Sequence, residues 1–344
     1  MVRQGNLGSV LHGMLPCVEH ILVVRAGAVG DGLLTLPALS ALRTRWPAAR
    51  VTLLGPRSLL PFVRAAGLVD AALPVEDDAG RMLYGDDSPH APTWAAADLA
   101  VVWLKQWVHV AGRLDQWGVK RTVGSPSQPP EDANIHVADY LFQALDPLGI
   151  GRVRARQPRL VPAAAEERAA QWWRERIGTG APPVVAMHPG SGGASKRWPV
   201  ERYVEVAEAL TRGGLGVLVL LGPAESDILA QWQLVADRAT NLQILSGLEL
   251  PVIAGMLTRC AAYVGNDSGV SHLSAALGVP TLAIFGPTNP ARWAPIGPIV
   301  RVLRDPAWRL EATKTQQSRW SLGSERVAAV CFHVIAKRSR TAGR

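Results

Sequence analysis

Short apolar runs alternate along this chain with segments whose apolar residues recur at helical spacing. The clearest unit begins with an apolar run at residues 261–264, followed by the polar turn 265–269 (GNDSG) and a helical segment. A second apolar run at 281–285 ends in the turn 286–288 (GPT). Strand, polar turn, helix, strand and polar turn in this order predict a parallel α/β unit.

The same alternation continues through most of the chain. Further apolar runs predict strands at residues 20–25, 51–54, 98–104, 119–124, 184–187, 216–221 and 242–245. Helical spacing is found at residues 32–46, 135–148, 162–177, 198–210, 226–239 and 250–260. Pro37 lies inside the first of these helices, so we expect an irregular first turn or a kink there. The pattern predicts an α/β protein with doubly wound parallel sheets.

The change of composition after residue 149 indicates two domains. We place the first domain at residues 1–160 and the second at 161–320, joined by a connection rich in Gly, Pro and Arg at 149–159. Residues 321–344 are expected to form a last helix (325–337) that could cross back to the first domain, and a basic tail. Residues 1–18 lack the pattern of a signal peptide and are expected to be a short extension. Residues 77–93 have the composition of a long exposed loop.

Composition limits the partners and the compartment. Hydrophobic residues make up 48% of the 344 residues and charged residues 19%, which indicates a folded protein. The net charge of +8 favours anionic partners such as a nucleotide, a phosphorylated glycolipid or a membrane surface, although biased codon usage explains it equally well. Three widely spaced cysteines give neither a zinc motif nor a disulfide framework, and no apolar run approaches the ~20 residues of a bilayer span. We expect a protein of a reducing compartment.

The turn that contains Asp267 and Ser268 is the first candidate site. Both residues are strong helix N-caps, and the free N–H groups of a first helical turn can hold an anion. In parallel α/β sheets, ligands bind at the carboxyl ends of the strands, where both polar turns of this unit should lie. The stretch therefore predicts a binding site for a nucleotide diphosphate.

A second candidate is Asp31, in the turn after the first strand. Gly27, Gly30 and Gly32 surround it, but their spacing is GxxGxG rather than the GxGxxG of dinucleotide-binding folds. The next strand also ends without the acid that would hold the ribose of NAD. Asp31 could be a general base at the cleft, or an acid that only caps the following helix.

Three separated motifs resemble glycosyltransferase family 9, the lipopolysaccharide heptosyltransferases. They are RAGAVGDGLLTLPALSALR at 25–43, HPGSGGASKRWPVERYVEVAEAL at 188–210 and VGNDSGVSHLSAALGVPTLAIFGPTNPARWAPIG at 264–297. The resemblance covers most of residues 20–300 and implies two Rossmann-like domains that face a cleft, the GT-B fold. It also implies transfer of heptose from an ADP-sugar to an anionic lipid A–Kdo acceptor, with inversion and without a required metal or cofactor.

The resemblance assigns roles to individual residues. Asp31 matches the family's catalytic acidic position, Lys196 matches a lysine near the diphosphate, and Glu225 matches an acidic residue near the nucleotide ribose. The signature D-[ST]-G-x-x-H, which lines the nucleotide sugar, is matched by Asp267, Ser268, Gly269 and His272, and Ser191 in the second motif is a further donor-binding candidate.

The chemistry asks for the same residue types. A lysine and helix N-termini can stabilise the charge that develops on a diphosphate leaving group, and a carboxylate can take the proton of the acceptor hydroxyl. Arg25 and Arg57 are candidates for binding an acceptor phosphate or carboxylate, with ordinary surface placement as an equal alternative. The other candidates also have structural interpretations, namely capping for Asp267, a first-turn acid for Glu225, a local hydrogen bond for His272 and a solvated side chain for Lys196.

Together these observations predict an inverting, metal-independent glycosyltransferase. The expected donor is a nucleotide-activated heptose, foremost ADP-heptose, and the expected acceptor is a lipopolysaccharide core or another anionic saccharide. We expect a cytoplasmic protein that contacts the inner face of the inner membrane peripherally and does not bind nucleic acid. The alternatives are a catalytically degenerate nucleotide-sugar-binding protein and a sugar-nucleotide epimerase on the same fold.

Overall fold

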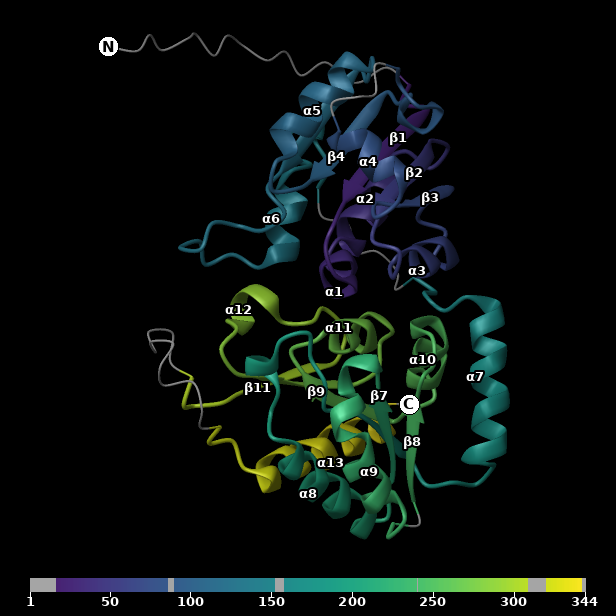
Figure 1. The fold of residues 1–344 in the computed structure, drawn as a ribbon, viewed down its shortest axis with the longest axis vertical. Coiled ribbons are helices and arrows are strands. Elements are labelled where there is room, and N and C mark those ends of the chain that lie inside the picture. Colours follow the sequence, from purple (N-terminus) through teal and green to yellow (C-terminus); the bar gives the residue numbers. More distant parts are fainter. Residues whose placement is uncertain (1–16, 86–89, 152–157, 240, 309–319, 342–344) are drawn as a thin grey trace.

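Two parallel sheets form the framework of the molecule, as the computed structural model shows (Figure 1). The structure describes residues 17–85, 90–151, 158–239, 241–308 and 320–341, and for residues 337–341 the backbone only. The first sheet has the order β3-β2-β1-β4-β5 and the second has the order β11-β10-β9-β6-β7-β8. Both are doubly wound parallel sheets, as predicted.

The first sheet lies in the amino-terminal half. Its strands are β1 (His20–Arg25), β2 (Arg50–Gly55), β3 (Ala71–Pro74), β4 (Leu99–Trp103) and β5 (Arg121–Ser125). The helices around it are α1 (Val29–Leu33), α2 (Leu36–Arg45), α3 (Leu60–Ala65), α4 (Asp78–Tyr84), α5 (Trp107–Gln116) and α6 (Val137–Gln143), with 3-10 turns at Thr93–Ala95 and Asp146–Leu148. The interruption between α1 and α2 confirms the irregularity that Pro37 predicts, because this proline occupies the first turn of α2.

The second sheet lies in the carboxyl-terminal half. Its strands are β6 (Val184–His188), β7 (Gly216–Leu221), β8 (Leu242–Ser246), β9 (Ala262–Asn266), β10 (Thr281–Phe285) and β11 (Val300–Arg304). Its helices are α7 (Ala163–Arg176), α8 (Val200–Arg212), α9 (Leu229–Ala236), α10 (Leu250–Leu257), α11 (Gly269–Ala276), α12 (Pro290–Trp293) and α13 (Ser324–Thr341), with 3-10 turns at Ala194–Lys196 and Pro223–Ile228. Helix α7 packs on α10 so closely that a side chain at Gly255 would meet Ala169 at 2.7 Å.

Alternate residues of the central strands enter different cores. In β1, Ile21 and Val23 belong to one buried cluster, whereas Leu22 and Val24 belong to another. This division follows from the two-residue period of a strand in a sheet that helices cover on both faces. It explains why the strands read as continuous apolar runs in the sequence.

The strand order reverses at one point in each sheet. The first reversal lies between the neighbouring strands β1 and β4, and the second between β6 and β9. The crevice outside the carboxyl ends of such strands is where ligands bind in doubly wound sheets. The turns after β1, β6 and β9 carry most of the candidate residues, so the topology places these residues at the two crevices, whereas Glu225 follows β7 and Arg57 follows β2.

Several short elements differ from the prediction. The segment 77–93 is not one loop, because it contains α4, whose Gly80 allows the helix to approach the carbonyl of Val75 where a side chain would clash. The elements α3, β3, α5 and β11 were not predicted at all. The predicted boundary at residue 160 falls between the 3-10 turn at Asp146–Leu148 and α7.

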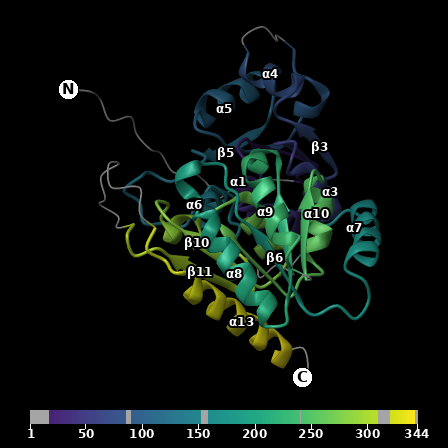
Figure 2. The ribbon, with the colours of Figure 1, turned by 60° about the horizontal axis from the view of Figure 1, so that its bottom comes forward.

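The last helix does not cross back to the first domain. Helix α13 packs against α8, away from the first domain (Figure 2). Val327, Ala328 and Cys331 of α13 enter the core. Ser324 Oγ donates a 2.6 Å hydrogen bond to Glu205 of α8 and ties down its first turn. The helix continues to Thr341, so most of the predicted tail is helical. Residues 1–16 of the predicted extension, 152–157 of the connection and 342–344 of the tail lie outside the described residues.

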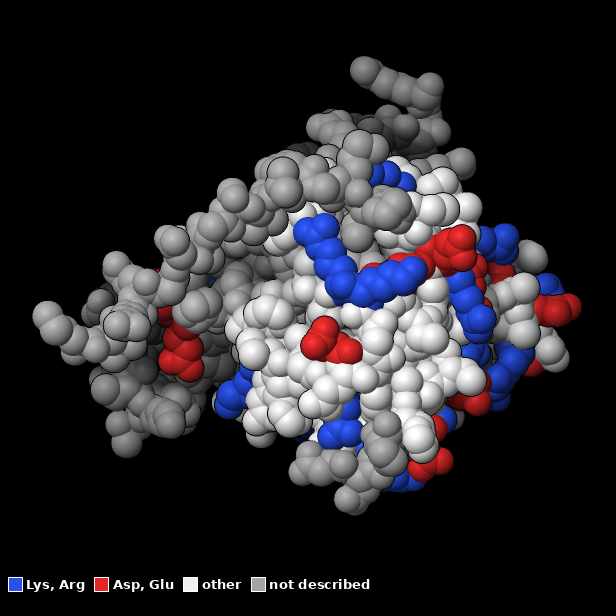
Figure 3. Space-filling view, turned by 90° about the horizontal axis from the view of Figure 1, so that it is seen from above, with Lys and Arg blue, Asp and Glu red and all other residues white. Residues whose placement is uncertain are grey.

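The outer end of the first domain carries mixed charge. On the face that Figure 3 shows, basic and acidic side chains are interspersed on a largely uncharged surface. The net charge of +8 is therefore not gathered into one continuous basic area on this face. None of the described helices is long and apolar enough to span a membrane.

Candidate active site

The two domains meet where α1 faces α11. A side chain at Gly30 would lie 3.1 Å from His272 Cδ2 and 3.3 Å from the Cα of Gly269. A side chain at Gly269 would lie 2.6 Å from Val29 Cγ1. Glycines at these two positions therefore let the first turns of both helices touch, and they bring the turn of Asp31 to the turn of Ser268.

Asp31 lies in the first turn of α1, at the switch point of the first sheet. Its Oδ2 accepts a 3.0 Å hydrogen bond from the N–H of Ala28, which is the capping arrangement that the sequence left open. Its Oδ1 lies 3.7 Å from Arg25 Nη2, and the side chain is 23% exposed. Capping thus occupies one oxygen, and the other oxygen faces a cation.

Arg25 is not at the surface. It is only 1% exposed, and its Nη1 donates to the carbonyls of Ser127 at 3.0 Å and Trp103 at 3.4 Å. Burial lowers the pKa of Arg25, and the charge of Asp31 opposes that shift. Ordinary surface placement, the alternative for Arg25, is wrong, because Arg25 ends a central strand that is covered on both faces. Binding of the acceptor by Arg25 stays a prediction.

Lys196 and Asp267 form an ion pair at the switch point of the second sheet. Lys196 Nζ donates to Asp267 Oδ2 at 2.8 Å, and the two side chains are 38% and 7% exposed. Ser191 Oγ donates to the backbone carbonyl of Asp267 at 2.8 Å. Three residues predicted to bind the sugar donor, from two motifs far apart in the sequence, thus lie together.

The start of α11 carries Ser268, Gly269 and His272, three more of the residues predicted to bind the sugar donor. Ser268 is the N-cap, and its Oγ accepts a long 3.4 Å hydrogen bond from the N–H of Ser271. Burial lowers the pKa of His272 to about 4, a shift that the charges of Asp267 and Asp31 oppose and those of His136 and Lys196 assist. His272 is therefore neutral at physiological pH, and its buried Nδ1 has no hydrogen-bond partner among the described residues.

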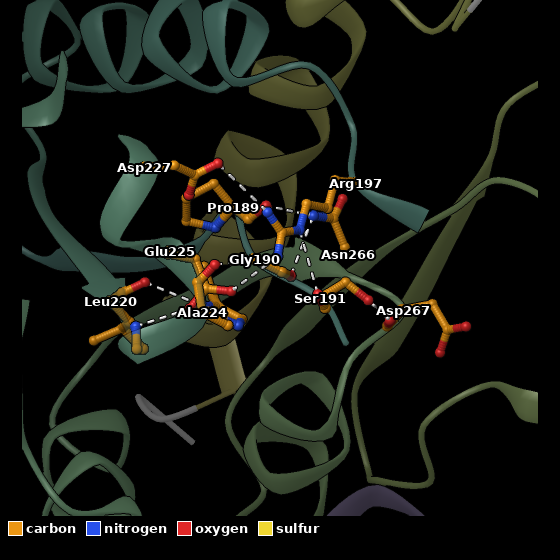
Figure 4. Close-up of polar contacts among 12 residues, drawn as sticks. Pro189, Gly190, Ser191, Arg197, Leu220, Ala224, Glu225, Asp227, Asn266 and Asp267 are labelled. Carbon is orange, nitrogen blue, oxygen red and sulfur yellow. Dashed lines mark hydrogen bonds and ion pairs between the residues drawn. The ribbon is translucent and has the colours of Figure 1, made fainter. Parts of the chain in front are cut away.

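Glu225 lies in the 3-10 turn after β7 and is only 4% exposed. Its Oε2 accepts a 2.9 Å hydrogen bond from the N–H of Gly222, and its Oε1 lies 3.9 Å from Arg197. Figure 4 shows Arg197 among Ser191, Ala224, Glu225 and Asp227. The sequence analysis missed Arg197, although its place beside Lys196 was a usable signal.

Asn266 joins the second and third motifs and was also missed. Its Oδ1 accepts hydrogen bonds from the N–H of Trp198 at 3.0 Å and from Tyr203 Oη at 2.9 Å. Its Nδ2 donates to the carbonyls of Pro189 at 2.7 Å and Gly190 at 3.2 Å. This fully buried amide fixes the loop that carries Ser191 and Lys196 against the end of β9.

Arg57 does not join this group of residues. Its Nη2 lies 2.7 Å from both carboxylate oxygens of Asp77, and the side chain is 66% exposed. Arg57 follows β2, whereas Asp31 follows the neighbouring strand β1, and the charge of Arg57 is already matched by Asp77. Binding of the acceptor by Arg57 stays a prediction.

Comparison with known proteins identifies the family of the chain. The sequence model described as glycosyltransferase family 9 (heptosyltransferase) matches residues 137–321, more than half of the chain. The chain belongs to glycosyltransferase family 9. Lipopolysaccharide heptosyltransferase 2 of Salmonella typhimurium is 27% identical over 312 residues, which cover 83% of this chain and 87% of that protein.

Solved structures show that the fold is shared. A family 9 glycosyltransferase from Veillonella parvula matches with a TM-score of 0.75 at 19% identity, over 93% of this chain and 97% of the other. The E. coli heptosyltransferase WaaC with ADP matches with a TM-score of 0.67 at 18% identity, over 92% and 99% of the two chains. The GT-B-like fold predicted from the sequence is thereby confirmed, and so is the prediction that the protein is a glycosyltransferase.

The family 9 site combines groups suited to group transfer. On the second domain it offers an ammonium group (Lys196) and the start of α11, both suited to an anion. On the first domain it offers a carboxylate, Asp31, with a cation behind it. Among the described residues, no group of three or more His, Cys, Asp or Glu side chains could hold a metal ion.

Two further contacts bridge the domains of this family 9 protein. His136 Nε2 donates to the carbonyl of Ala294 at 2.9 Å, while its Nδ1 accepts from the N–H of Ala138. The guanidinium of Arg292 on α12 donates to four backbone carbonyls of the first domain at 2.7–2.9 Å, those of Pro129, Pro130, Glu131 and Ala133. Neither His136 nor Arg292 has a local sequence pattern that indicates its role, because both contact residues far away along the chain.

Proposed function

We propose that this family 9 enzyme transfers a heptose or a related sugar from a nucleotide-diphosphate donor, foremost ADP-heptose, to an anionic saccharide of the lipopolysaccharide core. The observation that carries the proposal is the placement of Asp31 on α1 against the start of α11, beside the Lys196–Asp267 pair. The relatives support it, since one is a lipopolysaccharide heptosyltransferase and another was solved with ADP.

The donor diphosphate would bind at the second domain. Lys196 is the most exposed charged group of the Lys196–Asp267–Ser191 cluster, and its ammonium is available to a phosphate on the side away from Asp267. The N–H groups at the start of α11 point toward the same crevice, and a helix N-terminus favours an anion. These groups would stabilise the charge that grows on the leaving diphosphate without a metal ion.

The acceptor hydroxyl would be activated by Asp31. Its Oδ1 accepts no hydrogen bond from the described backbone, and the guanidinium of Arg25, 3.7 Å away, holds the carboxylate in place. A general base in this position takes the proton as the hydroxyl attacks the anomeric carbon. Attack from the face opposite the diphosphate inverts that carbon.

Glu225 and His272 would complete the donor site. Glu225 lies beyond the diphosphate region, after β7, where a ribose could meet its carboxylate once Arg197 shifts. The neutral imidazole of His272 can exchange a hydrogen bond with the sugar or the phosphate through its unpartnered Nδ1. We further propose that the enzyme works in the cytoplasm and approaches its acceptor at the inner face of the inner membrane.

The proposal is tested by product analysis. Purified enzyme is incubated with ADP-heptose and Kdo2–lipid A in detergent, and the product is examined by mass spectrometry and by NMR of the anomeric centre. A heptosylated product with inverted configuration, formed equally in the presence of EDTA, is expected. Conversion of the donor without any acceptor, or activity that EDTA abolishes and added metal restores, would contradict the proposal.

A further inference from the structure

A groove of about 710 Å³ lies outside the crevice of Asp31, between the first domain and the start of α7. Its walls are α3, the end of β3 and the chain that leads into α7. Figure 1 shows this chain segment facing α3. Its described lining combines three arginines (Arg57, Arg64 and Arg159) with an apolar wall that includes Leu60 and Val161, and it contains no acidic residue. An apolar wall with an excess of positive charge suits an amphipathic anion.

Two of these arginines keep donor groups for a ligand. The charge of Arg57 is already matched by Asp77, whose two oxygens both lie 2.7 Å from it. Arg64 donates one hydrogen bond, of 2.6 Å, to the carbonyl of Ala72 and has no ion pair with a described residue. Arg159 makes neither kind of contact within the described part of the chain. A guanidinium carries five N–H donors, so most of those on Arg64 and Arg159 remain available.

The first turn of α7 adds to the positive potential of the groove. This helix has 14 residues, its N-cap is Pro162, and no side chain caps its free N–H groups. Ala163, its first residue, lines the groove. The acid of this turn, Glu166, is neutralised by Arg259 at 2.8 Å. Unpaired N–H groups at a helix start attract anions.

We propose that this groove, through Arg64 and Arg159, binds an anionic group, a phosphate or a carboxylate, of the glycolipid acceptor. The inference rests on the proposed function and specifies how the acceptor is held. The position of the groove suits that task. Leu59, which precedes the lining residue Leu60, packs so closely on α1 that a side chain at Gly32 would lie 2.6 Å from it. Gly32 follows Asp31 in α1. The start of α3, which walls the groove, therefore packs against α1, the helix that carries the base.

The double variant Arg64→Gln/Arg159→Gln tests the inference, with Arg238→Gln, an exposed arginine of the second domain, as the control. Both groove residues are exposed, so the melting temperature is expected to stay unchanged. In the double variant, the KM for the acceptor Kdo2–lipid A should rise about tenfold or more over the wild-type value, because hydrogen bonds to charged groups contribute binding free energy of that size. The KM for ADP-heptose should not change. An acceptor KM that stays at the wild-type value would overturn the inference.

Two further measurements separate the possible outcomes. If inorganic phosphate stabilises the wild type against heat but not the double variant, while the acceptor KM is equal in both, the groove is a site for free anions and the acceptor assignment is wrong. If the wild type transfers no sugar at all, the proposed function fails, and binding of Kdo2–lipid A followed by tryptophan fluorescence decides the groove. Weaker binding by the double variant alone supports the inference, and equal binding by all three proteins refutes it.

Discussion

Arg25 and Asp31 form an ion pair in which Arg25 Nη2 lies 3.7 Å from Asp31 Oδ1, and the arginine is buried while the aspartate is partly exposed. The carbonyls of Trp103 and Ser127 hold the guanidinium from behind. The fold thus fixes a cation next to a carboxylate that remains accessible. We interpret Arg25 as a positioning residue for the base rather than as a group that touches the substrate.

The first prediction concerns this pair. Replacing Arg25 by Met removes the cation beside Asp31 Oδ1 and lets the carboxylate turn out of position. We expect kcat to fall about tenfold, since small misplacements of reacting groups are costly, while the KM for the donor stays unchanged. Arg25→Lys, which keeps the charge, should lose less activity. Equal kcat values for all three proteins would contradict the interpretation of Arg25 as a positioning residue.

The second prediction concerns the contact between α1 and α11. Gly269→Ala places a methyl group 2.6 Å from Val29 Cγ1, so the two helix starts must move apart. We expect kcat to fall about tenfold or more, since small misplacements of reacting groups are costly. Val29→Ala removes the obstructing methyl groups and should restore much of the activity in the double variant. Equal kinetics for Gly269→Ala and wild type, or no rescue, would argue against close apposition of these helices during catalysis.

The third prediction concerns the contact between Arg292 and the first domain. Arg292→Gln cannot bridge four carbonyls, and the loss of hydrogen bonds to a charged group should weaken the domain contact. Small-angle X-ray scattering is expected to give a larger radius of gyration for this variant, and KM should rise for both substrates. Arg238→Gln makes the same change of charge on the second domain and should alter neither quantity. An unchanged scattering curve for Arg292→Gln would contradict the prediction.

The fourth prediction is a dependence of stability on pH. Burial lowers the pKa of His272 to about 4, below the ordinary value of 6.5. Between these values the unfolded chain binds more protons than the folded protein, so the free energy of unfolding falls as the pH falls through this window. The contribution is at most about 3 kcal/mol. The stabilising contribution of the neutral His272 is fully present above pH 6.5 and is lost progressively as the pH falls toward about 4.

His272→Gln isolates this contribution. Urea unfolding of both proteins is measured across the window, and the wild type should lose more stability on acidification than the variant does. Burial also lowers the pKa of His188, but both proteins keep this residue. Subtracting the pH dependence of the variant from that of the wild type therefore removes the contribution of His188. Parallel dependences on pH would show that His272 titrates normally in the folded protein.

The sequence was informative where a local pattern reports burial or a turn. The central strands were found because both of their faces are covered, and Asp31 and Asp267 were placed correctly because each follows such a strand. Strand β3 was missed because its four residues are mostly half-buried, and α4 was misjudged because Gly80 is normally a turn former. In these elements, tertiary contacts rather than local preferences decide the structure.

Residues that act across the chain were beyond sequence analysis. Nothing around Arg292 indicates that carbonyls some 160 positions earlier will surround it. Asn266 stands in a recognised motif, but its four hydrogen bonds become evident only when the loop after β6 is placed beside β9. Surface placement was one of two alternatives for Arg25 because arginines usually are exposed, and the burial of its strand overrides that preference.

The most direct test of the account is the turnover of Asp31→Asn with donor binding measured on the same sample. The amide keeps the size of the side chain but cannot take a proton from the acceptor hydroxyl. We predict that kcat falls at least about a hundredfold, in line with general-base catalysis, while ADP raises the melting temperature as it does in the wild type. A variant that binds ADP normally and turns over at close to the wild-type rate would contradict the assignment of Asp31 as the base.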